Sequence, residues 1–91
     1  MGPRIDNKAH YQIDKYDIYA PKDVPPDLVE TAYRLIKEKR QLIWDQTFKG
    51  RYINYTRTNF IDDVEYWIDY SLDFKTYNII FTDISPRHEK R

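Results

Sequence analysis

The spacing of the prolines divides this chain more sharply than any other feature. Three of the five prolines lie within six residues, at positions 21, 25 and 26. Proline lacks a backbone N–H and fixes φ, so this segment suits neither a helix interior nor a central strand. We therefore expect residues 21–26 to form an extended connector, with Pro26 at the first position of a helix. Residues 11–20, which precede it, are rich in aromatic and β-branched side chains and predict a strand.

Two amphipathic helices are predicted after the connector. Residues 27–48 place their apolar side chains on one arc at helical spacing, although Lys39 falls near the middle of that arc. Residues 60–74 show a second apolar arc at the same spacing, and Thr58 or Asn59 provides a candidate N-cap. Both segments therefore predict helices that face a common core.

Strands at residues 51–56 and 77–84 complete a predicted β-α-β-α-β order. This order predicts a small α+β fold in which a three-stranded sheet packs against two amphipathic helices, with residues 77–84 as the central strand. A chain of 91 residues makes one domain. We assign that domain to residues 11–84, with a flexible arm at 1–10 and a solvated tail at 85–91.

Composition excludes several classes of site. The chain has no cysteine, so disulfides and cysteine-bearing zinc sites are excluded. No apolar run approaches the roughly 20 residues that span a bilayer, and the N-terminus lacks the apolar region of a signal peptide. We therefore expect a cytoplasmic protein without a membrane partner.

His10 and His88 lie in the predicted tails without a third ligand, and two glycines cannot form a phosphate loop. We expect no metal, no cofactor and no enzymatic activity.

The charges are balanced in total but separated along the chain. Fifteen basic and fifteen acidic residues give zero net charge. Between Glu30 and Arg57 there are seven basic and three acidic residues, whereas between Thr58 and Phe74 there are five acidic and no basic residues. Opposite charges on two regions of one chain can attract a second copy, so a homodimer is one expectation.

The acidic segment predicts a partner-binding face. On a helix its carboxylates fall within one narrow arc, where they could steer a basic partner while the flanking tyrosines act as anchors. The same arc could instead be solvated, or be paired with Arg34, Lys37 and Arg40. We expect a small non-enzymatic protein-interaction module, an adaptor or inhibitor of the kind found among phage and mobile-element accessory proteins, that binds a larger protein. The predicted partner-binding residues are Asp62, Glu65, Tyr66, Asp69, Tyr70 and Asp73.

Residues 49–57 indicate an alternative function. Basic and aromatic side chains alternate there on a predicted strand, an arrangement that can stack bases while neutralising phosphates. The alternative is therefore binding of RNA or single-stranded nucleic acid. Its predicted residues are Lys37, Arg40, Lys49, Arg51, Tyr52, Tyr55 and Arg57.

Overall fold

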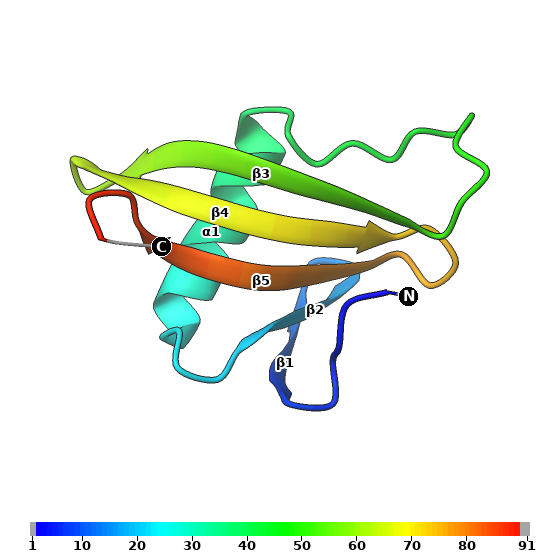
Figure 1. Ribbon diagram of the computed structural model, residues 1–91, viewed down its shortest axis with the longest axis horizontal. Coiled ribbons are helices and arrows are strands. Elements are labelled where there is room, and N and C mark those ends of the chain that lie inside the picture. The colour runs from blue at the N-terminus through cyan, green and yellow to red at the C-terminus, as the bar shows by residue number, and fades with distance from the viewer. Residues whose placement is uncertain (1, 90–91) are drawn as a thin grey trace.

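A computed structural model describes residues 2–89, and within them one helix packs on one face of a five-stranded sheet (Figure 1). The elements are β1 (Lys8–Ile13), β2 (Tyr16–Pro21), α1 (Pro26–Glu38), β3 (Tyr52–Ile61), β4 (Val64–Asp73) and β5 (Asn78–Pro86). The sheet order is β1-β2-β5-β4-β3, and only β2 and β5 pair in parallel. The predicted three-stranded α+β fold with two helices is therefore wrong, because the protein is mainly β.

The predicted strand at 11–20 is a hairpin. Strands β1 and β2 pair in antiparallel fashion around a turn at Asp14 and Lys15, where Asp14 has a φ of 55°. Aspartate is one of the few residues that tolerate this left-handed conformation, so the chain reverses without glycine. The hairpin begins at Lys8, and the last three residues of the predicted N-terminal arm thus belong to the sheet.

The first predicted helix is confirmed at its start and wrong at its end. It begins at Pro26, as the proline pair indicated, but its last residue is Glu38. Arg40 has a φ of 58°, its N–H donates to Lys37 O, and the next N–H, that of Gln41, donates to Ile36 O at 2.7 Å.

These bonds form a Schellman motif with arginine in the position that glycine usually occupies. Lys39 is the exposed C-cap, so it does not lie within an apolar arc.

The second predicted helix, at 60–74, is also wrong. Strand β3 continues to Ile61, and β4 returns after a two-residue turn in which Asp62 and Asp63 have φ values of 51° and 66°. Two positive φ values are typical of a type I′ turn, whose twist suits a hairpin. Thr58 and Asn59 are not caps, because both lie within β3.

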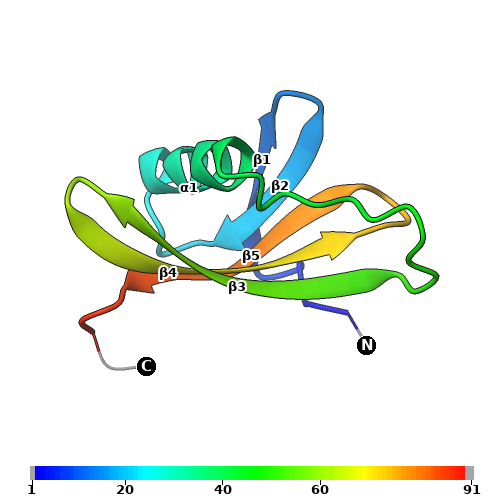
Figure 2. The same ribbon diagram turned by 90° about the horizontal axis from the view of Figure 1, so that it is seen from above.

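The core lies on one face of the sheet. Helix α1 and the tip of the β1–β2 hairpin lie on one side of β3, β4 and β5, whereas the described segments before β1 and after β5 lie on the other side (Figure 2). Strand β5 is the middle strand, as its apolar sequence predicted. The fully buried core residues are Ile18, Ala20, Val29, Ala32, Tyr33, Ile36, Ile68, Leu72, Ile79 and Phe81.

Asp14 connects the hairpin turn to the helix. Its carboxylate accepts hydrogen bonds from Tyr33 Oη at 2.6 Å, Lys37 Nζ at 3.1 Å and Arg34 Nη1 at 3.1 Å. The bonds from Tyr33 and Lys37 lower the pKa of Asp14 from 3.8 to about 2. Burial, together with the bond to Asp14, raises the pKa of Tyr33. The carboxylate is therefore stabilised in its charged form in the folded protein.

Acid titration tests this connection. Because the folded pKa of Asp14 is depressed, its contribution to stability is complete above 3.8 and disappears as pH falls towards about 2. We expect Asp14→Asn, which keeps a residue tolerant of positive φ, to lower stability at neutral pH and to reduce the further loss over this acid range. Urea unfolding at several pH values measures both effects, with the exposed Asp23→Asn as control. An unchanged acid dependence in Asp14→Asn would contradict the assignment.

The end of α1 gives a second prediction. Glycine adopts the positive φ of Arg40 without strain, so Arg40→Gly should stabilise the protein by about 1 kcal/mol. Lys39→Gly is the matched control, because Lys39 has a φ of −80° and glycine there only adds freedom to the unfolded chain. Thermal and urea unfolding should show shifts of opposite sign for the two variants. A loss of stability in Arg40→Gly would show that the helix does not end here.

Candidate protein-interaction site

The side of the sheet opposite α1 carries a row of carboxylates. Side chains alternate between the two faces along a strand, and the strand pairings extend this alternation across the sheet. In β4, Ile68, Tyr70 and Leu72 are buried towards the helix. The side chains at the intervening positions point away from α1, and we call this side of the sheet the open face. In β4 these are Glu65, Trp67, Asp69, Ser71 and Asp73.

Neighbouring strands add acids to the same face. Asp83 of β5 lies directly opposite Asp69, next to a register shift between Asp69 and Tyr70. The register thus brings two carboxylates to neighbouring strands, and the Ser85 hydroxyl donates to Asp83 Oδ2 at 2.8 Å. Asp17 of β2 also faces this side, where it contacts His10 at 2.8 Å. Among the strand residues of the open face, five are acidic and Lys8 is the only lysine or arginine.

Two arginines cover the ends of the acidic row. Arg51 Nη2 contacts Asp73 Oδ2 at 3.0 Å, and Arg87 Nη1 contacts Glu65 Oε1 at 2.9 Å. Burial acts to raise the pKa of Asp73, but the bond from Arg51 and those from nearby backbone groups lower it overall. Arg87 also lies 5.4 Å from the ring centroid of Trp67. The acids at both ends of the row are thus paired with arginines, and Asp69 and Asp83 lie between them.

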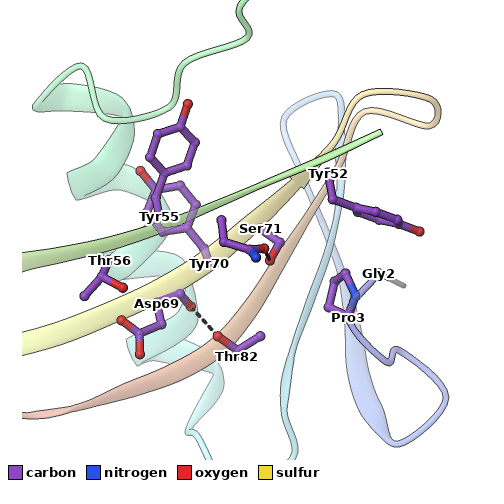
Figure 3. A pocket seen from close by; sticks show the side chains of 10 residues that line it. Gly2, Pro3, Tyr52, Tyr55, Thr56, Asp69, Tyr70, Ser71 and Thr82 are labelled. Atoms are coloured by element: carbon purple, nitrogen blue, oxygen red, sulfur yellow. Dashed lines mark hydrogen bonds between the residues drawn. The ribbon is translucent and has the colours of Figure 1, made fainter. Parts of the chain in front are cut away.

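A groove of about 400 Å³ opens beside Asp69 (Figure 3). The Thr82 hydroxyl donates to Asp69 O at 3.2 Å, and the Ser71 hydroxyl donates to Asn54 Oδ1. Gly2 closes one end so tightly that a Cβ there would lie 2.1 Å from the Tyr52 ring. The groove is therefore lined mainly by polar groups. Its lining comprises Gly2, Pro3, Tyr52, Asn54, Tyr55, Thr56, Asp69, Tyr70, Ser71 and Thr82.

The predicted partner-binding residues do not all share this face. Glu65, Asp69 and Asp73 lie on it, whereas Asp62 lies in the turn between β3 and β4. Tyr66 and Tyr70 point to the helix side, where both contribute to the core. Tyr70 is 1% exposed, its hydroxyl donates to Gln41 O, and burial raises its pKa.

The sequence also predicted, as an alternative, that the acidic residues pair with Arg34, Lys37 and Arg40 of the same chain. Arg34 and Lys37 contact Asp14 and not the acidic row, and Arg40 lies at the end of α1. Arg51 and Arg87 contact the two ends of the row. The binding roles of all these residues stay predictions.

The predicted nucleic-acid residues are divided between the two faces. Tyr52 lies on the open face, beside the acidic row and with Arg51 over its ring. Tyr55 points to the helix side, where its ring stacks on Tyr70 and the Arg57 guanidinium covers it at 5.2 Å. Lys37 is on α1 and is bonded to Asp14. Arg40 and Lys49 lie in the segment that follows α1.

Sequence reasoning missed Trp67, Asp83 and Thr82 as members of the open face. The signal was present in residues 64–73, where valine, tyrosine, isoleucine, tyrosine and leucine alternate strictly with polar residues or tryptophan. Alternation of this kind predicts a half-buried strand. The spacing of the apolar residues in the same segment also fits one face of a helix, so the sequence alone favours neither structure.

Searches for related proteins gave no match: no protein-family model, curated protein or solved structure matches this chain. Within residues 2–89 no helix is long and apolar enough to cross a membrane. In the same part of the chain, no three histidine, aspartate or glutamate side chains are grouped as a metal ion would require.

Proposed function

We propose that this chain is a non-enzymatic protein-binding module whose open face binds a basic surface on a larger protein. The observation that carries the proposal is the cross-strand pair of Asp69 and Asp83 on the face that α1 leaves uncovered. Two carboxylates on neighbouring strands concentrate negative charge at one place on this face, and that charge would attract and steer a cationic side chain of a partner. The acidic surface that the sequence predicted on a helix is thus proposed on strands.

The surroundings of this pair support a protein partner. Trp67 and Tyr52 are half-buried on the same face, beside Arg87 and Arg51, and their remaining exposed surface is of the aromatic kind that is enriched in protein interfaces. A groove bordered by hydroxyl and amide side chains adjoins them, so a partner could combine ion pairs with neutral hydrogen bonds. An adaptor or an inhibitor would both use such a face.

The charge of the face favours a protein over a nucleic acid. Carboxylates outnumber basic side chains there, and phosphate groups would be repelled from it. The basic and aromatic residues of the alternative do not form one continuous surface, because Tyr52 lies on the opposite side of the sheet from Tyr55 and Arg57.

Titration with a decalysine peptide, followed by amide resonances in two-dimensional NMR, tests the location of the binding face. We expect the peptide to perturb the open-face residues of β4 and β5 and to leave the helix unchanged. The double variant Asp69→Asn/Asp83→Asn should weaken binding by about three- to tenfold, the loss expected for two ion contacts at half-buried surface positions. Added salt should weaken binding of the wild-type chain.

The matched control is Asp23→Asn/Glu38→Gln, which removes the same charge from exposed positions away from the open face. Equal weakening by both double variants would mean that the peptide responds only to net charge. That result would contradict the proposed face, as would perturbations confined to the helix side. A single-stranded oligonucleotide that perturbs the open face more strongly than the peptide would favour the nucleic-acid alternative.

A further inference from the structure

Strand β3 forms a long outer edge of the sheet. It has ten residues, lies at the end of the strand order, and pairs only with β4. The other edge strand, β1, has six residues. A long edge strand presents a row of unpaired N–H and C=O groups that can pair with another chain.

The hydrogen bonding at one end shows which backbone groups point outwards. Phe74 N–H donates to Arg51 O at 2.7 Å, one position beyond the paired strands and in the same register. Hydrogen-bonded and non-hydrogen-bonded pairs alternate along the strand. The odd-numbered residues of β3 therefore direct their backbone N–H and C=O groups to β4, and the even-numbered residues direct theirs outwards. Within residues 2–89, the outward groups make no backbone hydrogen bond. The outward-facing residues are Tyr52, Asn54, Thr56, Thr58 and Phe60.

The segment that follows α1 runs beside β3 on the helix side, where Gln41 accepts a hydrogen bond from Asn59, but β3 itself lacks the features that usually protect an edge strand. It contains no proline, and its register with β4 is unbroken over ten residue pairs. Its single charged residue is Arg57, whose guanidinium lies over the Tyr55 ring. Phe60 is 66% exposed and is the most exposed large apolar side chain among the described residues. The edge is therefore long, regular and largely uncharged.

We infer that β3 pairs in antiparallel fashion with β3 of a second copy, which joins two sheets into one. A two-fold axis at Thr56 places each outward-facing residue opposite another outward-facing residue. It sets Tyr52 opposite Phe60 of the second copy, so that the exposed phenylalanine gains an aromatic partner.

The same register sets Arg57 opposite Tyr55 of the second copy and avoids placing two arginines directly opposite each other. A shift of the axis to Arg57 would bring the two guanidinium groups together, at a cost in stability. The register centred on Thr56 thus gives Phe60 an aromatic partner and keeps the two arginines apart, and this complementarity is the reason for choosing a second copy as the occupant of the edge. The inference does not rest on the function proposed for the open face, although Tyr52 and the groove beside it belong to both surfaces.

Analytical ultracentrifugation over a range of concentrations tests the pairing. We expect a monomer–dimer equilibrium that persists at high salt, because backbone hydrogen bonds and apolar contacts form the interface. Thr56→Pro removes an outward N–H that β4 does not use, and proline is tolerated at such edge positions. It should raise the dimer dissociation constant at least tenfold while the amide spectrum of the folded monomer is retained.

A second variant tests the interface independently in case Thr56→Pro does not fold. Phe60→Lys places a charge at the exposed end of β3 and should also weaken the dimer, whereas Tyr77→Lys, at another exposed aromatic residue, should not. A chain that stays monomeric at all concentrations would overturn the inference. So would a dimer that dissociates in high salt, or one that Thr56→Pro and Phe60→Lys leave unchanged.

Discussion

The parallel pairing of β2 with β5 is the constraint on which the rest of the structure depends. It sets Ile18 beside Ile79 and joins the N-terminal hairpin to the three-stranded meander. Parallel strands cannot be connected by a tight turn, so a crossover must separate them in sequence. Here the crossover contains α1, which covers one face of the sheet with Val29, Ala32 and Ile36. The chain has no second helix within residues 2–89 to cover the other face.

This one-sided arrangement determines which side chains can meet a partner. The alternation of β4 sends Ile68, Tyr70 and Leu72 to the core and its acids to the opposite face, on which Asp73 is itself buried beside Arg51. The Asp69–Asp83 pair and the open edge of β3 are then two separate features of one incompletely covered sheet. The first concerns charge and a basic partner, whereas the second concerns backbone hydrogen bonds and a second copy. Binding at one does not require the other.

The sequence predicted the features that proline and apolar content determine locally. These include the start of α1 at Pro26 and the central place of β5. It misled where two periods coincide: residues four apart share a face both on a helix and on a strand, so the spacing of Glu65, Asp69 and Asp73 fits either structure. The turns at Asp14, Arg40 and Asp62 were hidden because each adopts positive φ without glycine. The facing of Asp69 and Asp83 depends on the β4–β5 register, which no local pattern shows.

The central claim is that residues 60–74 form part of a hairpin whose acidic side faces away from the helix, and nuclear Overhauser effects test it most directly. Thr58 with Trp67, and Thr56 with Asp69, are non-hydrogen-bonded pairs in the β3–β4 register. Their Hα atoms lie close together in such pairs. The structure predicts strong Hα–Hα effects within both pairs. Their absence, together with sequential amide–amide effects through residues 60–74, would show a helix there and contradict the proposed open face.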